Sequence, residues 1–148
     1  MNTSVSTLLE HKGSKVFSVP SDVTVCAAVQ EMNRHKVGAV VVMQAGKLVG
    51  IFTERDVLAR VVAPGLDPKT TPIEKVMTRD PVTVESTATV EQVMTLFTDK
   101  RFRHLPVVDQ GALIGLISIG DILRRMVDAH RHEAEQLKHY ITTGGYPT

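Results

Sequence analysis

The sequence lacks the residues that mark several classes of protein. Its 148 residues include one cysteine and no tryptophan, and aromatic residues make up 4% of them. Because one cysteine cannot form a disulfide within the chain, Cys26 is typical of a reducing compartment. The longest apolar run, Val37 to Met43, is far shorter than the roughly 20 residues of a membrane-spanning helix. The first residues, MNTSVSTLLE, lack the segments of a signal peptide. We therefore expect a cytoplasmic protein with no membrane partner.

The net charge of the chain is also small, and common catalytic motifs are scarce. Seventeen basic and sixteen acidic residues give +1, which removes the electrostatic reason to bind nucleic acid. The sequence contains neither a GxxxxGKS/T phosphate loop nor a GxGxxG motif. No histidine or aspartate is placed beside Cys26 to activate it, and His130, His132 and His139 are poorly spaced for one metal. A metal site at His132 and Glu135 remains an alternative. We expect no enzyme and no catalytic or metal-binding residues.

An internal repeat dominates what the sequence does contain. When residues 16–62 are laid over residues 81–127, a constant shift of 65 positions gives 12 identities in 47 pairs without a gap. Unrelated sequences of ordinary composition would give roughly three. Most of the other pairs exchange one apolar residue for another. The chain is therefore an internal duplication.

Both copies have the same predicted order of elements. A short extended segment, at residues 16–19 and 81–84, precedes residues that can cap a helix. Apolar residues then recur with helical spacing from Val25 and from Val90. Two apolar strands joined by a glycine turn follow, at residues 38–43 and 47–53 in the first copy and at 104–109 and 112–118 in the second. A second helix begins near Glu54 and near Ile119. Each copy is a β-α-β-β-α unit, which predicts an α/β (α+β) fold.

The repeats divide the chain into four predicted regions. The first repeat covers residues 8–65 and the second covers residues 76–128. Residues 66–75 between them form a linker, because Pro64 and Gly65 directly precede this segment and Pro68 and Pro72 lie in it. Residues 129–148 form a C-terminal helix and tail. Since a unit of about 50 residues buries little surface alone, we expect the two repeats to pack against each other.

Each repeat places a hydroxyl and a carboxylate three residues apart where its second strand ends. The pairs are Thr53 with Asp56 and Ser118 with Asp121. The spacing is that of a helix cap, in which the hydroxyl accepts a backbone N–H and the carboxylate lies in the first turn. The same geometry suits a nucleotide, because a helix N-terminus attracts phosphate and a carboxylate accepts ribose hydroxyls. The two interpretations are compatible, and both remain open.

The tandem β-α-β-β-α order and two stretches, KVGAVVVMQAGKLVGIFTERDVL and RFRHLPVVDQGALIGLISIGDIL, resemble a pair of CBS domains, or Bateman module. The resemblance covers about residues 8–128. It implies two repeats packed with pseudo-two-fold symmetry, with small sheets covered by helices and two clefts between the sheets. In the family these clefts bind adenine nucleotides, commonly AMP, ADP or ATP, and in some members NAD(H) or S-adenosylmethionine. It also implies a disc-shaped homodimer.

The resemblance implies two sets of nucleotide-binding residues. One cleft would use Ser118 and Asp121 at the ribose, with Val16, Phe17, Gly38 and Ala39 along the base. The other would use Thr53 and Asp56, with Val82, His104 and Pro106 along the base. Arg103 and His104, near the centre of the module, are the candidates for the phosphate. Because Gly38 and Ala39 stand where the second copy has Arg103 and His104, we expect unequal sites. Arg103 as a solvated charge and His104 as a hydrogen-bonded strand residue remain alternatives.

Two functions fit these predictions. The first is a non-catalytic sensor of adenine nucleotides with no obligatory cofactor. Its ligand shifts the module or its homodimer between arrangements that a regulated protein recognises. The second is a ligand-free dimerisation scaffold, in which both hydroxyl–carboxylate pairs only cap helices. In either case we expect the dimer interface on the helices that follow the two pairs, and at Leu137, Tyr140 and Ile141.

Overall fold

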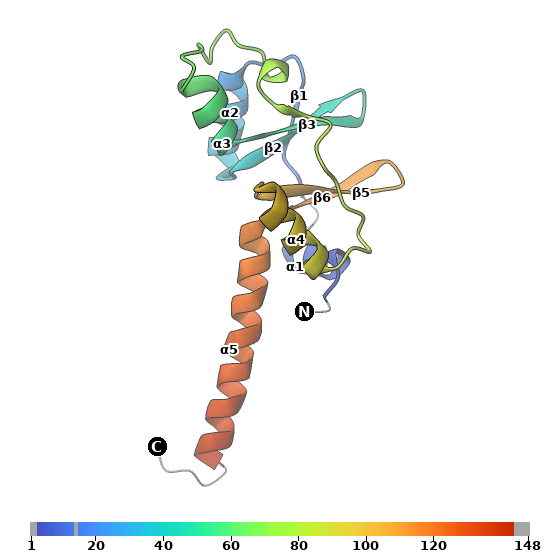
Figure 1. The fold of residues 1–148 in the computed structure, drawn as a ribbon, viewed down its shortest axis with the longest axis vertical. Helices are drawn as coiled ribbons and strands as arrows, with labels where there is room; N and C mark the ends of the chain where they lie inside the picture. The colour runs from blue at the N-terminus through green and yellow to red at the C-terminus, as the bar shows by residue number, and fades with distance from the viewer. Residues whose placement is uncertain (1–2, 14, 144–148) are drawn as a thin grey trace.

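The structure is a computed structural model that describes residues 3–13 and 15–143 (Figure 1). Its elements are α1 (Val5–Lys12), β1 (Ser18–Pro20), α2 (Val25–His35), β2 (Ala39–Gln44), β3 (Lys47–Thr53), α3 (Glu54–Asp56), η1 (Val57–Val62), η2 (Ile73–Lys75), β4 (Thr78–Arg79), α4 (Val90–Lys100), β5 (His104–Asp109), β6 (Ala112–Ser118) and α5 (Ile119–Thr143). The predicted α/β fold is confirmed, and three of the four predicted hairpin strands have the predicted bounds.

The strands form two small sheets, and β4 of the first sheet lies within the predicted second repeat. The first has the order β1-β2-β3-β4, with β1 parallel to β2 and the other pairs antiparallel, and the second consists of β5 and β6. Figure 1 shows the two sheets in adjacent lobes, and β3 contacts β6 between them. Both hairpins turn through two residues with positive φ, Ala45–Gly46 and Gln110–Gly111, as a tight type I′ turn requires.

The second repeat lacks a first strand comparable to β1. Its predicted extended segment, residues 81–84, forms a single bridge between Val84 and Val107. In the first repeat the N–H of Val41 extends the pairing by donating to the carbonyl of Phe17 at 3.1 Å. The residue equivalent to Val41 is Pro106, which has no N–H to donate. The pairing therefore stops after one residue.

Threonine side chains cap both predicted amphipathic helices. The hydroxyl of Thr24 accepts the N–H of Ala27 at the start of α2, and that of Thr89 accepts the N–H of Gln92 at the start of α4. These contacts satisfy N–H groups that have no partner within the helix. The two helices therefore begin at the residues predicted from their apolar spacing.

Each repeat has its own hydrophobic core. The segment that precedes the second repeat packs on the first core, and the segment at the start of the chain packs on the second core. The first core, around Phe52, includes Ile73 and Val76 from the segment between the repeats. The second core, around Ile117, includes Val5, Leu8 and Leu9 of α1. Figure 1 accordingly shows α1 beside α4 in the second lobe. The N-terminal helix thus packs on the repeat that is farther away along the chain.

The predicted linker is packed against the first repeat. The N–H groups of Val25 and Cys26, at the start of α2, donate to the carbonyls of Thr71 and Pro68, both at 2.9 Å. The N–H of Ile73 donates to the carbonyl of Val23 at 2.9 Å. The linker therefore supplies acceptors for the first turn of α2. The predicted limits of the repeats stay a prediction.

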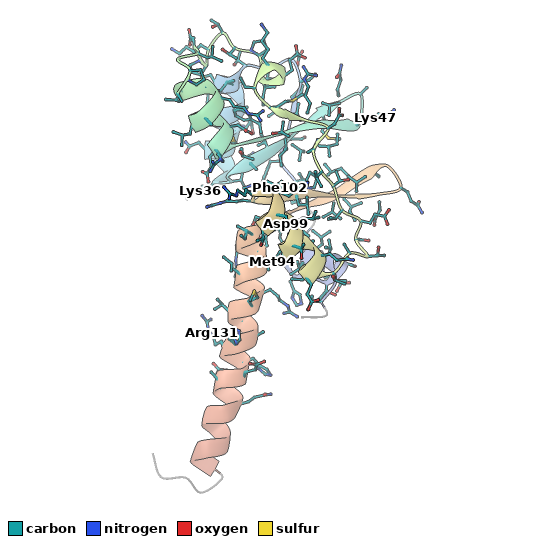
Figure 2. All side chains as sticks on the ribbon, viewed as in Figure 1. Lys36, Lys47, Met94, Asp99, Phe102 and Arg131 are labelled. Carbon is teal, nitrogen blue, oxygen red and sulfur yellow. The ribbon has the colours of Figure 1, made fainter. Side chains whose placement is uncertain are left out.

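Helix α5 continues well beyond the second core. Residues 127–136 are all exposed, and Figure 2 shows Arg131 on the part of the helix that stands away from both lobes. The side chains of Leu137, Tyr140 and Ile141 lie outside the described residues, as do residues 144–148, where the tail is predicted. Among the described residues, no helix combines the length and apolar composition needed to cross a membrane.

Candidate functional site

The pair Thr53 and Asp56 forms a complete capping box at the end of β3. The N–H of Thr53 donates to Oδ2 of Asp56 at 2.9 Å, and the N–H of Asp56 donates to Oγ1 of Thr53 at 3.3 Å. Asp56 is buried, and its Oδ1 lies 3.6 Å from Nε of Arg60. The helix-cap interpretation is therefore confirmed for this pair. It leaves one carboxylate oxygen, Oδ1, outside the cap.

The pair Ser118 and Asp121 makes the same cap but has one additional partner. The N–H of Ser118 donates to Oδ2 of Asp121 at 2.8 Å, and the N–H of Asp121 donates to Oγ of Ser118 at 3.1 Å. The ammonium group of Lys12, at the end of α1, donates to the same Oδ2 at 2.7 Å. The two pairs therefore share a backbone geometry and differ in what reaches the carboxylate.

The electrostatics of Asp121 follow from these contacts. Burial alone would raise the pKa of its carboxyl group, because a charged group loses hydration. The hydrogen bonds from Lys12 and from the N–H of Ser118 outweigh burial and hold the pKa below its ordinary value of 3.8. Asp121 is therefore an ionised acceptor that already has its donors.

A pocket of about 540 Å³ opens beside the Thr53–Asp56 pair. Its walls come from the end of β3, from α3 and η1, and from residues 78–82 and 100–104 of the second half of the chain. The lining residues are Ile51, Thr53, Glu54, Arg55, Asp56, Leu58, Thr78, Pro81, Val82, Lys100, Arg101, Phe102, Arg103 and His104. Four of the five residues predicted for this cleft line the pocket together, and so does Arg103, the other predicted phosphate contact. The fifth, Pro106, is buried within β5.

The pocket combines apolar walls with a strongly basic rim. Four cationic residues line it, Arg55, Lys100, Arg101 and Arg103, and all four are exposed. Arg101 ends α4 with a φ of 58°, so the chain reverses direction at the rim. The apolar part includes Phe102, whose ring packs edge-on against Phe97 with ring centroids 5.9 Å apart. A ligand with a flat ring system and an anionic group fits this combination.

His104, the first residue of β5, also lines the pocket. Burial lowers the pKa of its imidazole below 6.5, and the charge of Lys12 lowers it further. The carboxylates of Glu54 and Asp121 act in the opposite direction but do not prevail. His104 is therefore neutral at pH 7, and it offers a ligand hydrogen bonds in place of a positive charge.

The other predicted set of residues is less well gathered. Ala39 is buried and pairs with Thr53, while the carbonyl of Gly38 accepts the N–H of Glu54 at 3.0 Å. The ring of Phe17 is already stacked on His35, with centroids 3.8 Å apart. Val16 is half-buried before β1. None of these four predicted base contacts lines the pocket at Asp56.

A smaller pocket of about 370 Å³ lies where α1 meets α5. Asp121 lines it, and Ser118 and the four predicted base contacts do not. The lining residues are Leu8, His11, Lys12, Asp121, Arg124, Arg125 and Asp128. Four of these are potentially cationic. The structure therefore surrounds Asp121 with basic side chains and not with the predicted apolar wall.

Several residues that line the larger pocket could not be predicted from the motifs in the sequence. Lys100, Arg101 and Phe102 belong to the run KRFRH, which reads as a solvated charge cluster at a helix–strand connection. The signal that was available is the aromatic residue inside that run, since an exposed loop rarely needs one. Lys12 was also missed, because nothing in the sequence relates it to Asp121.

Other chemistry-bearing residues do not form a site. Within residues 3–13 and 15–143, no group of three or more histidine, cysteine or acidic residues is placed to hold a metal ion. His132 instead contacts the side-chain amide of Gln136 at 3.0 Å. Cys26 is a free, half-buried residue of α2. The pockets are therefore the features that carry a functional interpretation.

Comparison with known proteins identifies the fold and the repeat together. The CBS domain family matches residues 9–63 and residues 73–128. The chain belongs to the CBS-domain family. The resemblance seen in the sequence is confirmed, and the two repeats are a tandem CBS pair, which is a regulatory module in this family.

Relatives of this CBS pair span nearly the whole chain. "CBS domain-containing protein CBSX3, mitochondrial" of Arabidopsis thaliana is 38% identical over 98% of this chain and 74% of its own length. The crystal structure of ATU1752 from Agrobacterium tumefaciens is 40% identical, with a TM-score of 0.80 over 84% of this chain and 99% of that chain. PAE2072 from Pyrobaculum aerophilum, solved in complex with AMP, is 30% identical, with a TM-score of 0.72 over 80% of this chain and 88% of that chain.

Proposed function

We propose that this CBS pair is a non-catalytic regulatory module that binds an adenine nucleotide in the pocket at Thr53 and Asp56. The observation that carries the proposal is the composition of that pocket. A carboxylate, an apolar wall and a basic rim line one cavity of about 540 Å³, which is within the range of pockets that bind small molecules. AMP, ADP, ATP and NAD(H) all present the three matching groups.

Each part of a nucleotide has a counterpart in the pocket. Oδ1 of Asp56 accepts the ribose hydroxyls, because Oδ2 already accepts the N–H of Thr53 at 2.9 Å. The adenine ring lies against the apolar residues Val82 and Phe102. The phosphate lies at Arg103, whose guanidinium can donate two parallel hydrogen bonds to it. Neutral His104 donates or accepts one further hydrogen bond.

The AMP complex of PAE2072 supports this class of ligand. That protein is 30% identical to this chain and shares its fold. AMP contains the base, the ribose and the phosphate for which the pocket at Asp56 has matching groups. Which adenine nucleotide this chain prefers is part of what the titration below measures.

We further propose that the module works as a homodimer that signals to a regulated protein. Leu58 and Val62 on η1 and Leu123 and Val127 on α5 are large apolar residues that remain exposed. They follow the two hydroxyl–carboxylate pairs, where the interface is predicted. Because Leu58 also lines the pocket, a nucleotide there directly touches the proposed dimer surface. This contact provides a route from ligand to dimer arrangement.

The cytoplasm is the location we propose, since a lone cysteine is typical of a reducing compartment. The relative CBSX3 is named as mitochondrial, so an organelle is the alternative location. Imaging a C-terminal fluorescent fusion in its own cell type tests it. Signal confined to an organelle would contradict the proposal.

A titration with nucleotides tests the binding function. We expect AMP, ADP, ATP or NADH to raise the melting temperature, because a ligand of the native state stabilises it by about 2.7 kcal/mol at a concentration 100 times its Kd. Asp56→Asn should abolish the shift while the protein stays folded. Asp22→Asn is the matched control, because Asp22 is an exposed aspartate outside the pocket lining. The same samples should show no nucleotide turnover.

The complete helix caps favour the ligand-free dimerisation scaffold as the second candidate. Both carboxylates already accept backbone N–H groups. The caps alone therefore explain why an aspartate recurs at the same position in both repeats, without a ligand. If no adenine nucleotide at millimolar concentration shifts the melting temperature of the wild-type protein, the scaffold is the better description.

A further inference from the structure

The carboxylate of Asp121 is occupied by a side chain of the same protein. The ammonium nitrogen of Lys12 lies 2.7 Å from Oδ2 of Asp121 and 2.6 Å from the carbonyl oxygen of Leu116. The side chains of Lys12 and Asp121 are 33% and 11% exposed. Two short hydrogen bonds from one ammonium group place Lys12 at a defined position, unlike a freely moving surface lysine.

Packing of α1 places Lys12 beside Asp121. Leu8 and Leu9 of this helix lie in the second core, and Gly115 of β6 allows the close approach. A Cβ atom added at Gly115 would lie 2.6 Å from Cδ2 of Leu9. Helix α1 therefore rests directly on β6, and its last residue, Lys12, reaches the end of that strand.

The equivalent carboxylate in the first repeat has no such partner. Under the shift of 65 positions, the residue that corresponds to Lys12 is Met77. Its side chain packs against Gly50, the counterpart of Gly115, and it carries no charge. Asp56 instead has Nε of Arg60 beside its Oδ1, at the longer distance of 3.6 Å. The two carboxylates thus differ in the residue at the position of Lys12, lysine or methionine, and in the arginine that lies 3.6 Å from Oδ1, Arg124 for Asp121 and Arg60 for Asp56.

We infer that Lys12 closes the Asp121 cleft to the ribose of a nucleotide and so determines that the chain binds its ligand at Asp56. This inference rests on the proposed function. The cap leaves Oδ1 of Asp121 for a ribose hydroxyl, as it does at Asp56, but the Lys12 ammonium lies 2.7 Å from the adjacent Oδ2, and Nη2 of Arg124 lies 3.6 Å from Oδ1 itself. The hydrogen bond from Lys12 is charge-assisted and roughly twice as strong as a neutral one, so a ribose hydroxyl does not displace Lys12 from the cleft. Lys12 is a specificity-determining residue that acts through Asp121.

The number of nucleotides bound per chain tests this role. Isothermal titration with AMP should find one site in the wild-type protein and two in Lys12→Met, the substitution that copies Met77 into the second repeat. The Kd at the opened site should fall by about tenfold or more relative to that site in the wild type. In Lys12→Met/Asp121→Asn the number should return to one, since the freed carboxylate is then missing. Lys47→Met, at the exposed tip of the β2–β3 hairpin (Figure 2), is the matched control.

Each outcome separates this inference from the proposed function. If the wild type and Lys12→Met bind the same number of AMP molecules, the inference is wrong, whether that number is none, one or two. If the wild type and Lys12→Met each bind one AMP molecule, the proposed function at Asp56 still holds. No site in the wild type but one in Lys12→Met would overturn binding at Asp56 and still support the role of Lys12. Lys12→Gln, which keeps a polar side chain without the charge, gives the same test if Lys12→Met does not fold.

Discussion

Leu58 and Leu123 occupy equivalent positions in the two repeats, 65 residues apart, and both remain exposed, at 66% and 49%. Val62 and Val127, one helical turn further along, are a second equivalent pair that is exposed. A duplicated apolar pair on the outside of each repeat is what a symmetric interface between two copies would use. We expect these residues to become buried when the protein forms a dimer.

Charge placed in this surface should therefore separate the dimer. We predict that Leu123→Asp shifts the protein from dimer to monomer, because a carboxylate would have to lose its hydration in an apolar interface. Size-exclusion chromatography with light scattering measures the mass. Leu66→Asp is the control, since Leu66 is also exposed, at 43%, but lies between the repeats and outside these helices. A wild-type monomer, or equal dissociation by both variants, would contradict the assignment.

The second prediction concerns stability, and it follows from the segments that complete the two hydrophobic cores. Leu8 of α1 is buried in the second core, whereas Ile73 from the segment between the repeats is buried in the first. Leu8→Ala and Ile73→Ala should each lower the free energy of unfolding by about 2–5 kcal/mol, as truncation of buried aliphatic side chains does.

Hydrogen exchange distinguishes the two variants. Local opening follows the packing of each unit, so Leu8→Ala should speed exchange in β5 and β6, and Ile73→Ala should speed it in β2 and β3. Each variant is the control for the other. Faster exchange of β2 and β3 in Leu8→Ala, with β5 and β6 unchanged, would show that α1 packs on the first repeat after all.

Local sequence patterns were enough for most of the elements. Strands β3, β5 and β6 have the predicted bounds, because short apolar runs on both sides of a glycine turn determine a hairpin locally. No local pattern in the sequence indicates which core α1 joins, since that depends on contacts between distant segments. Pro106 shortened the pairing of residues 81–84 through one missing N–H, which becomes visible only once its strand partner is known.

The candidate site was likewise predictable in its local parts but not in its long-range contacts. The Thr53–Asp56 and Ser118–Asp121 pairs follow from the repeat, and five predicted residues do line one pocket. The contact of Lys12 with Asp121 joins residues 109 positions apart, and no periodicity in the sequence reports such a pair. The assignment of the twelve predicted residues to nucleotide binding stays a prediction that the Asp56→Asn titration addresses.

A third prediction concerns the pH dependence of stability through His104. Burial and Lys12 lower the pKa of this imidazole below 6.5 in the folded state. Between the lowered pKa and 6.5 the unfolded chain binds more protons, so stability should rise with pH in this window and fall as the pH drops below about 6.5. Urea unfolding at pH 5.5 and 7.5 measures the difference.

Replacing the imidazole should remove that part of the pH dependence. We expect His104→Gln to lose less stability than the wild type between pH 7.5 and 5.5, because glutamine does not titrate. His130→Gln, on the exposed part of α5, should behave like the wild type. An unchanged pH profile in His104→Gln would show that protonation of His104 is not the cause.

The fourth prediction follows the carboxyl group of Asp121 into acid. Burial opposes ionisation of Asp121, but the hydrogen bonds from Lys12 and Ser118 hold its pKa below 3.8. Stability from this group is therefore complete above about pH 4 and is lost as the pH falls through the lowered folded-state pKa. In Lys12→Met the burial remains and the ammonium donor is gone, so the pKa of Asp121 should rise. Carbon-13 NMR of the carboxyl group measures it directly, with Asp22 as the exposed reference in the same spectrum. A pKa of Asp121 that is equal in the two proteins would mean that Lys12 does not hold this carboxylate in solution, and the closing of the second cleft by Lys12 would then lose its physical basis.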